Sequence, residues 1–538
     1  MYNVALTHSL FQAQADTAIE PLTVGGALIA AAQAAPDKLF LDEALPDGSI
    51  GRRWTLAQLL ADAERLARAL ATRFEPGERV AIWAPNIPEW IIFEFATALA
   101  GLTMVTVNPA YRAKELRFVL EQSRSAGLYL TREFRGNPMA EIAADVCATL
   151  PAIRHVVDLE DHDTLYALAS APKPLPRVDP MAAVQIQYTS GTTGFPKGAV
   201  LHHLGIVNNA RLTMARLGAG ADDCYLGIMP MFHTAGCVIS VLGALQLGCR
   251  LVLLKQFDPE WANLTIERER VTFFCGVPTM LTAMLEALER NPRDFSSIRA
   301  AFSGGSVVPP ELNRRVQRRF GVCVEIIYGQ TETSPVLTQT SRHDPEEDRL
   351  HSLGQPLPQT EISIRDVVAN TVVPVGATGE ICARGYCVML GYNDNPDATA
   401  KTIDIEGWLH TGDLGVMDAR GYVRITGRVK EMIIRGGENL FPVEIENALL
   451  EHPALSEVAV VGVPDEKWGE LPICFFRAEP GQSPSRAELV AHCRRELAAP
   501  KTPAQWIRVD AFPLTGSGKI QKFVLRDRYM AGEYPDRL

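Results

Sequence analysis

The sequence YTSGTTGFPKG at residues 188–198 places three glycines, four serine or threonine hydroxyls and one lysine in a single loop. The apolar stretch AAVQIQ before it predicts a buried strand, and KGAVLHHLGIVNNARL at its end predicts a helix. Glycines let the backbone approach a ligand closely, and N–H groups, hydroxyls and an ammonium suit a bound phosphate. The loop therefore predicts a phosphate cradle, and a Gly/Thr-rich surface connection is the alternative that this stretch alone leaves open.

Strand and helix patterns alternate around this loop for most of the chain. RVAIWAP at residues 79–85 predicts a buried strand, and EWIIFEFATALAGL after it has the periodicity of a helix. Such alternation predicts an α/β fold in which helices cover both faces of parallel sheets. From about residue 362, short β segments with glycine-rich turns predict a small antiparallel or barrel-like subdomain. The last hundred or so residues have the pattern of a separate, small α+β unit.

Several classes of protein are disfavoured by the sequence. Neither the glycine loop nor GSGKI at residues 516–520 has the spacing of a P-loop NTPase. The formal net charge is −11 without a dense lysine and arginine run, which disfavours a nucleic-acid binder. The ten cysteines are scattered singly, which predicts neither a zinc site nor a disulfide framework. With no signal-peptide pattern and no apolar stretch of spanning length, we expect a cytoplasmic protein without a membrane span.

Five further stretches accompany the glycine loop. Together they resemble, in order, the motifs of the adenylate-forming superfamily, which includes acyl- and aryl-CoA synthetases, firefly luciferase and the adenylation domains of peptide synthetases. The resemblance extends over essentially the whole chain. The stretches are SGGSVVP at 303–309, YGQTETS at 328–334, GWLHTGD at 407–413, GRVKEMIIRGGENLFPVEIE at 427–446 and PLTGSGKIQK at 513–522.

The resemblance implies a reaction in two steps. A carboxylic acid is joined to ATP as an acyl-adenylate with release of pyrophosphate, and a thiol then displaces AMP. Because the first step is a displacement at the α-phosphorus, catalysis rests on positioning and charge neutralisation. ATP, Mg²⁺ and CoA are the implied cofactors or co-substrates, with a separate carrier protein as the alternative thiol.

Roles for the ATP-binding residues follow from the same resemblance. Thr331 is expected at the α-phosphate, and Glu332 is expected to hold Mg²⁺, a hard cation that prefers oxygen ligands. Asp413 is expected to accept both ribose hydroxyls, with Arg428 as an additional donor. The pyrophosphate end of ATP is assigned to Thr189, Ser190, Gly191, Thr192, Thr193 and Lys197, and the adenine end to Gly304, Gly305, Ser306 and Tyr328, with Gly329 and Gln330 as further nucleotide-binding residues.

A domain rearrangement is also implied. Lys519 is expected to enter the site during adenylation, and Lys430 is expected to be the hinge between residues 1–429 and a mobile C-terminal domain of residues 430–538. Rotation about this hinge would remove Lys519 and bring Gly436, Gly437 and Glu438 to the site for the thiol step. A solvated surface lysine is the alternative interpretation at both lysine positions.

The acid itself is less constrained. His233 in MPMFHTAG is expected beside the acyl pocket or, alternatively, as a core histidine. RGYCVMLGY and the C-terminal motifs look closest to medium-chain fatty acyl-CoA synthetases, while benzoate- or cinnamate-type aryl acids stay open. A luciferase-type oxidation and a non-catalytic nucleotide-binding relative are the alternatives of other classes, and a homodimer is the assembly to test. The expected acyl lining is Phe232, Ala235, Gly236, Val277 and Val336.

Overall fold

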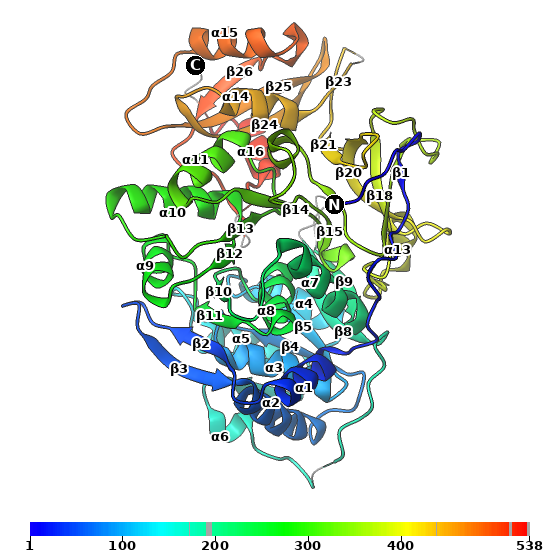
Figure 1. The fold of residues 1–538 in the computed structure, drawn as a ribbon, viewed down its shortest axis with the longest axis vertical. Helices are drawn as coiled ribbons and strands as arrows, with labels where there is room; N and C mark the ends of the chain where they lie inside the picture. The colour runs from blue at the N-terminus through cyan, green and yellow to red at the C-terminus, as the bar shows by residue number, and fades with distance from the viewer. Residues whose placement is uncertain (172, 190–195, 437, 516–518, 535–537) are drawn as a thin grey trace.

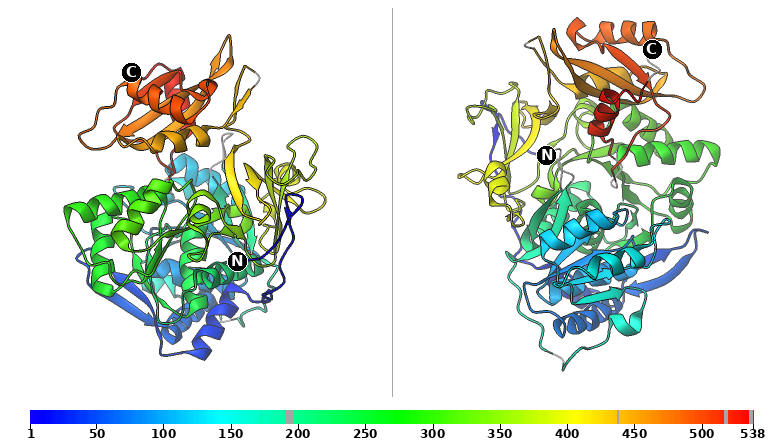
Figure 2. Two further views of the ribbon diagram at one scale, coloured as in Figure 1. Left: turned by 45° about the horizontal axis from the view of Figure 1, so that its top comes forward. Right: turned by 180° about the vertical axis from the view of Figure 1, so that it is seen from behind.

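The computed structural model describes residues 1–171, 173–189, 196–436, 438–515, 519–534 and 538. Figures 1 and 2 show two large sheets covered by helices, a smaller antiparallel sheet to one side and the C-terminal part of the chain above them. The α/β class expected from the alternating pattern is confirmed. None of the helices in the described ranges combines the length and the apolarity needed to cross a membrane.

The glycine loop follows one strand of the first large sheet, whose order is β19-β9-β8-β5-β4-β6-β7. Here β19 is Gly391–Tyr392 and β9 is Lys197–His202. The strands from β8 to β7 in this order are parallel, so Thr189, the last described residue before the glycines of the loop, lies at the carboxyl end of a parallel strand. Ligands of open α/β sheets bind at this edge. The parallel strands are β4 (Arg79–Trp83), β5 (Thr103–Val107), β6 (Gly127–Leu130), β7 (His155–Asp158) and β8 (Ala183–Thr189).

The helix predicted directly after the glycine loop begins later than expected. Residues Lys197–His202 form the strand β9, which pairs antiparallel with β8, and the helix α7 starts only at His203 and ends at Leu217. His202 is the N-cap of α7, since its Nδ1 accepts a hydrogen bond of 3.0 Å from the Gly205 N–H. Lys197 is the first residue of β9 (Lys197–His202) and pairs with Thr189, the last residue of β8. The structure therefore corrects the predicted start of the helix.

The second large sheet has the order β16-β15-β14-β13-β12-β10-β11-β2-β3. Its middle is parallel, and antiparallel strands form both edges. The strands are β2 (Leu39–Ala44), β3 (Ile50–Thr55), β10 (Cys224–Gly227), β11 (Arg250–Leu254), β12 (Phe273–Cys275), β13 (Ala300–Ser303), β14 (Val324–Gly329), β15 (Val336–Gln339) and β16 (Gln355–Pro356).

One core joins the two large sheets. The helix α3 (Pro88–Leu99) is buried along its whole length, as expected of a helix that is covered on all sides. Its Trp90 belongs to the same apolar cluster as Ile82 of β4 and Leu251 of β11. The relative position of the two sheet edges that carry motifs is therefore held by buried apolar packing.

The antiparallel sheet beside them has the order β1-β17-β18-β20-β21. Figure 1 shows that β1, near the N-terminus, lies beside strands from residues beyond 360, as the register with β17 requires. This sheet confirms the expected small β subdomain. Its strands are β1 (Leu10–Phe11), β17 (Thr360–Arg365), β18 (Gly379–Gly385), β20 (Leu409–Met417) and β21 (Val423–Arg428).

The C-terminal part has its own core of Ile445, Leu489 and Trp506 among other residues. Two ion pairs join it to helices of the N-terminal part: Arg477 Nη2 lies 3.7 Å from Glu286 Oε1, and Arg315 Nη1 lies 3.5 Å from Glu479 Oε1. Glu286 lies on α10 (Pro278–Arg290) and Arg315 on α11 (Pro310–Phe320), while Arg477 lies in β25 (Gly469–Ala478) and Glu479 directly follows that strand. The remaining elements here are β22 (Ile433–Arg435), β23 (Glu438–Leu440), β24 (Leu455–Asp465), β26 (Gln505–Arg508), α14 (Pro442–Leu450), α15 (Arg486–Glu496) and α16 (Lys522–Met530).

Candidate functional site

Two residues from other motifs bind the Asp413 carboxylate. The Tyr328 hydroxyl, at the end of β14, donates a hydrogen bond of 2.9 Å to Oδ2, and the Arg428 Nε donates one of 2.7 Å to Oδ1. Asp413 and Arg428 are direct neighbours in the register of β20 and β21, which explains their contact. The Asp413 carboxylate raises the pKa of Arg428, and burial and the same carboxylate raise the pKa of Tyr328 well above its ordinary value. The result is a fixed carboxylate on the subdomain, facing a strand end of the large sheet.

Lys519 lies in the same region although it is more than ninety residues further along the chain. A Cβ built on Gly305 would be 3.3 Å from Lys519 Cε and 3.9 Å from its Nζ, so the lysine side chain lies against the backbone of the SGGSVVP motif. Burial and the nearby Arg428 lower the pKa of Lys519, while Asp413 and Glu332 act to raise it. The Lys519 side chain thus lies within electrostatic range of two carboxylates that belong to separate motifs.

Glu332 is held by a residue that the motif analysis did not single out. The Tyr392 hydroxyl donates a hydrogen bond of 2.7 Å to Glu332 Oε1. The ring of Tyr392 also faces Lys197, whose Nζ lies 4.7 Å from the ring centroid, within the range of a cation–π contact. Tyr392 belongs to β19 (Gly391–Tyr392), which pairs with β9, so the strand that carries Lys197 also positions this tyrosine.

The aromatic residue at the end of RGYCVMLGY was the available signal for Tyr392, but its contacts depend on the pairing of β19 with β9. Nothing in the spacing of the sequence relates residue 392 to Glu332 or to Lys197. A tyrosine at a strand end is usually core packing, and only the tertiary contacts assign it to the site.

An apolar region adjoins Lys519. His233 lies just before the π-helix η1 (Ala235–Leu242), a type of helix that is common at functional sites. Burial, with a smaller contribution from the Lys519 ammonium, lowers the pKa of His233 to about 3, so the imidazole is neutral at pH 7. Val277 lies 3.7 Å from the Gly305 Cβ position and shares an apolar cluster with Val336. Apolar side chains and a neutral histidine therefore lie next to the charged group.

The remaining residues predicted to bind the nucleotide lie at strand ends and in short turns, and some of them fall outside the described residues. A Cβ at Gly304 would lie 2.2 Å from the Ile327 carbonyl oxygen, so the glycine permits a close backbone approach between β13 and β14. Thr331 is buried in the short 3₁₀ helix η2 (Thr331–Thr333), after Gly329 and Gln330, whereas Ser306 is exposed. Thr189 ends β8, and its Oγ1 contacts the Lys197 carbonyl oxygen at 3.4 Å. Predicted residues Ser190, Gly191, Thr192, Thr193 and Gly437 lie outside the described residues.

The residues predicted for the thiol step lie apart from Lys519. Gly436 and Glu438 are exposed at the connection of β22 and β23, which Figure 1 shows above the β subdomain. Lys430, also exposed, lies between β21 and β22 at the passage into the C-terminal part. The described arrangement therefore brings Lys519, and not this hairpin, near Asp413 and Glu332.

Comparisons with known proteins identify the family of this chain. Residues 28–393 match the family model AMP-binding enzyme, and residues 444–519 match AMP-binding enzyme C-terminal domain. YngI of Bacillus subtilis (strain 168) is 38% identical, with 94% of this chain and 97% of YngI covered. The mitochondrial medium-chain acyl-CoA ligase ACSF2 of Bos taurus is 35% identical, with 94% of this chain and 87% of ACSF2 covered.

Solved structures give the same result. The anthranilate CoA ligase AuaEII in complex with anthranoyl-AMP superimposes with a TM-score of 0.86 at 27% identity, covering 96% of this chain and 99% of AuaEII. The first family model alone spans more than half of the chain, and the motifs expected to bind ATP lie together in space. The chain therefore belongs to the AMP-binding enzyme family, the adenylate-forming superfamily, as an AMP-forming acid–CoA ligase.

Proposed function

We propose that this enzyme activates a medium-chain aliphatic carboxylic acid with ATP and transfers the acyl group to CoA. The observation that carries the proposal is the position of Lys519, which lies against Gly305, in the field of Asp413 and Glu332 and close to Val277. A cation at the junction of a polar and an apolar region suits a carboxylate whose chain extends into the apolar side.

In the first step, a carboxylate oxygen of the acid forms a bond to the α-phosphorus of ATP while the bond to the departing pyrophosphate breaks. Lys519 would lie between the two anions and reduce their repulsion, and Thr331 would donate to the α-phosphate. Two unit charges about 4 Å apart interact by about 4 kcal/mol at an effective dielectric constant of about 20. That energy corresponds to roughly a thousandfold in rate, which is a reasonable share for one positioned lysine.

The remaining nucleotide contacts follow from the same geometry. Asp413, fixed by Tyr328 and Arg428, would accept the ribose hydroxyls. Lys197, which belongs to the glycine motif in the sequence, would bind the pyrophosphate end of ATP. Glu332 fits a Mg²⁺ ion that accompanies ATP, because it offers a carboxylate, the hard oxygen ligand that Mg²⁺ prefers, held in place by Tyr392. When bound, the ion would neutralise phosphate charge.

For the second step, we propose that residues 430–538 rotate about Lys430, so that Lys519 leaves and the exposed β22–β23 hairpin with Gly436 and Glu438 approaches. The CoA thiolate would then attack the carbonyl carbon of the acyl-adenylate, and the bond to AMP would break. Each of the two orientations of residues 430–538 would serve one step, because the two steps need different groups near the same carbonyl carbon.

Two observations bear on the identity of the carboxylic acid substrate, and each favours a different class of acid. The medium-chain proposal is supported by the similarity to ACSF2 and by the apolar residues Val277 and Val336 near Lys519. An aryl acid is the second candidate, favoured by the structural similarity to AuaEII, whose bound anthranoyl-AMP is an aryl adenylate. Both candidates use the same adenylation chemistry and differ in the shape of the acyl pocket.

The test is pyrophosphate release, with and without CoA, across straight-chain acids of graded length and several aryl acids. Maximal turnover with a medium-chain acid and a requirement for CoA would support the proposal. Preference for an aryl acid would favour the second candidate. Acyl-adenylate formation without transfer to CoA would indicate a carrier protein as acceptor, and no release with any acid would contradict the catalytic proposal.

A further inference from the structure

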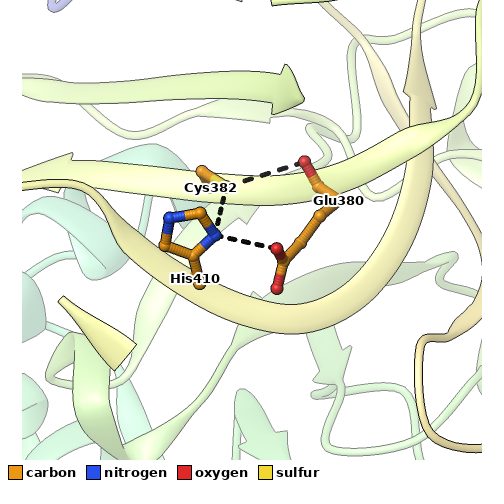
Figure 3. Close-up of side chains that lie close together, drawn as sticks. All are labelled: Glu380, Cys382 and His410. Carbon is orange, nitrogen blue, oxygen red and sulfur yellow. Dashed lines mark hydrogen bonds and ion pairs between the residues drawn. The ribbon is translucent and has the colours of Figure 1, made fainter. Parts of the chain in front are cut away.

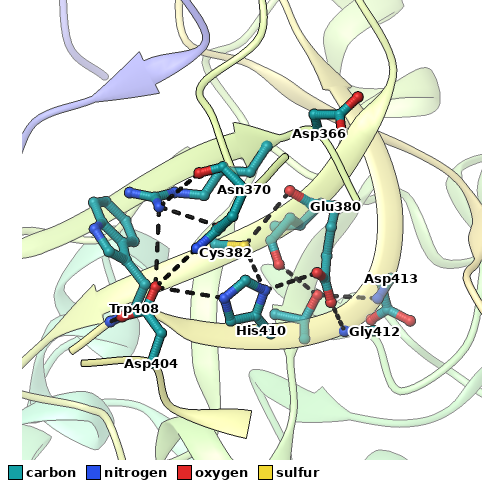
Figure 4. A network of polar contacts seen from close by, with 12 residues as sticks. Asp366, Asn370, Glu380, Cys382, Asp404, Trp408, His410, Gly412 and Asp413 are labelled. Carbon is teal, nitrogen blue, oxygen red and sulfur yellow. Dashed lines mark hydrogen bonds and ion pairs between the residues drawn. The ribbon is translucent and has the colours of Figure 1, made fainter. Parts of the chain in front are cut away.

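His410 of the GWLHTGD motif lies between two carboxylates, close to Asp413. Its Nδ1 is 2.8 Å from Glu380 Oε2, and its Nε2 is 3.5 Å from Asp404 Oδ2 (Figures 3 and 4). The Cys382 Sγ lies 3.4 Å from the same Nδ1. The hydrogen bond to Glu380 is the largest influence that raises the pKa of His410, and Asp404 acts in the same sense. The imidazole therefore lies between two carboxylates that favour its protonated form.

Glutamate, cysteine and histidine can also bind metals, but the contacts here are explained without one. Each ring nitrogen faces a carboxylate, so the protonated imidazole can donate through both nitrogens. Burial and the neighbouring Glu380 raise the pKa of the Cys382 thiol, which disfavours the thiolate that a metal would require. The function of the group is indicated by the second carboxylate oxygen of Glu380, Oε1.

That second oxygen contacts the backbone next to Asp413. The Gly412 N–H donates a hydrogen bond of 2.9 Å to Glu380 Oε1 (Figure 4). The Gly412 carbonyl accepts a hydrogen bond of 2.9 Å from the Val429 N–H. Gly412 has φ +74°, in the left-handed region that favours glycine. The peptide groups on both sides of Gly412 are thus held, one by a side chain of β18 and the other by the residue before Lys430.

The pairing of β18 with β20 is irregular at this place. Glu380 pairs with Leu414 and Cys382 with His410, so residues 411–413 face only Ile381 across the sheet. Such bulges commonly occur next to active sites, where they redirect a side chain. Hydrogen bonds of the Thr411 side chain take the place of the regular strand-to-strand hydrogen bonds at this bulge. The Thr411 Oγ1 donates to the Ile381 carbonyl at 2.7 Å and accepts from the Asp413 N–H at 3.1 Å.

From these contacts we propose that Glu380 is a positioning residue for ATP binding. Held by His410, it fixes the Gly412 peptide and thereby the direction in which the bulge presents the Asp413 carboxylate to the ribose hydroxyls. The inference rests on the proposed function, in which Asp413 binds the ribose. It deepens that function by assigning the geometry of the ribose contact to a residue that does not touch the nucleotide.

The experiment compares ATP with 2′,3′-dideoxy-ATP, which lacks both hydroxyls, in pyrophosphate release by the full-length enzyme. For Glu380→Ala we expect the KM for ATP to rise about tenfold, because a misplaced carboxylate loses its contacts, with little change in the KM for the acid. With dideoxy-ATP the same substitution should change the KM by less than about twofold. Glu380→Gln keeps an oxygen acceptor for the Gly412 N–H and should recover most of the ATP affinity.

Glu361→Ala is the matched control, since Glu361 lies in the same sheet and its carboxylate pairs with Arg384 at 2.6 Å. It should leave both KM values unchanged. If Glu380→Ala weakened ATP and dideoxy-ATP equally, Glu380 would not act through the ribose contact, and the inference would be wrong. A Glu380→Gln variant as impaired as Glu380→Ala, with an unchanged thermal unfolding midpoint, would also overturn it.

Failure of the proposed function gives a different result. If the unmodified enzyme released pyrophosphate with an acid but bound ATP and dideoxy-ATP equally well, acid activation would stand and the positioning inference would fall. If no acid caused the release of pyrophosphate, the proposed function itself would be refuted, and this inference with it.

Discussion

The Tyr392 hydroxyl donates a hydrogen bond of 2.7 Å to Glu332 Oε1, and the same ring lies beneath the Lys197 ammonium. One side chain thus connects the carboxylate proposed for Mg²⁺ with the lysine proposed for pyrophosphate. The two contacts use different parts of the tyrosine, the hydroxyl and the ring face, so that they can be removed separately.

Tyr392→Phe should lower the rate of pyrophosphate release by about tenfold and raise the Mg²⁺ concentration needed for half-maximal rate. The reason is the lost hydrogen bond to a carboxylate, an interaction typically worth about 1.5–3 kcal/mol. Tyr392→Leu should cost more, because it also removes the ring beneath Lys197. Tyr422→Phe is the control, since the Tyr422 hydroxyl donates to Asp344 at 2.8 Å in a similar tyrosine–carboxylate pair. A Tyr392→Phe enzyme with unchanged Mg²⁺ dependence would contradict this assignment.

Lys519→Ala should reduce acyl-adenylate formation about a thousandfold and leave thiolysis of supplied acyl-adenylate largely intact. The ammonium near Asp413 and Glu332 can assist only the step in which two anions meet. The two half-reactions are measured separately, by pyrophosphate release and by CoA-dependent consumption of acyl-adenylate. Lys501→Ala, which removes a lysine paired with Glu444, should affect neither. Equal loss in both half-reactions would show that the division of labour is wrong.

Glu286→Lys should slow adenylation by a few-fold relative to thiolysis. It replaces the attraction between Glu286 and Arg477, 3.7 Å apart, by repulsion between the N-terminal and C-terminal parts in the arrangement that holds Lys519 in the site. The effect should be small and should fade at high salt, because this partly exposed pair is in contact with solvent, and ion pairs at the surface contribute below about 1 kcal/mol and are screened. Glu260→Lys, beside Arg290 within the N-terminal part, is the control. An equal change in both half-reactions would argue against a role in domain orientation.

His410→Gln should destabilise the protein more at low pH than at high pH. The His410 ring faces Glu380, Asp404 and the Cys382 thiol, and Arg365 approaches Asp404 to 4.0 Å. Because the pKa of His410 is raised in the folded state, its charged form stabilises the fold fully below the unfolded value of about 6.5. This contribution is lost as the pH rises through the folded pKa. The difference in thermal unfolding midpoint between the two proteins, measured from pH 6 to pH 9, should therefore shrink with rising pH, and a constant or growing difference would refute it.

The local sequence determined much of this protein. Alternating apolar strands and amphipathic helices predict the parallel sheets, because the pattern of burial along β4 and α3 follows directly from residue type and spacing. The order of the motifs predicts the family, and residues such as Asp413, Arg428 and Lys519 do lie together. Even the error at β9 was one of boundary, where KGAVLH pairs with β8 before the helix begins.

Only the tertiary structure decided which residues of distant strands are in contact. Tyr392 reaches Glu332 because β19 pairs with β9, and Glu380 reaches Gly412 because β18 and β20 are out of register at one bulge. Pairing of this kind depends on the packing of whole sheets, and the residues involved have no characteristic spacing along the chain. The same holds for Lys519, whose motif is evident in the sequence, but whose position against Gly305 depends on how the C-terminal part rests on α10 and α11.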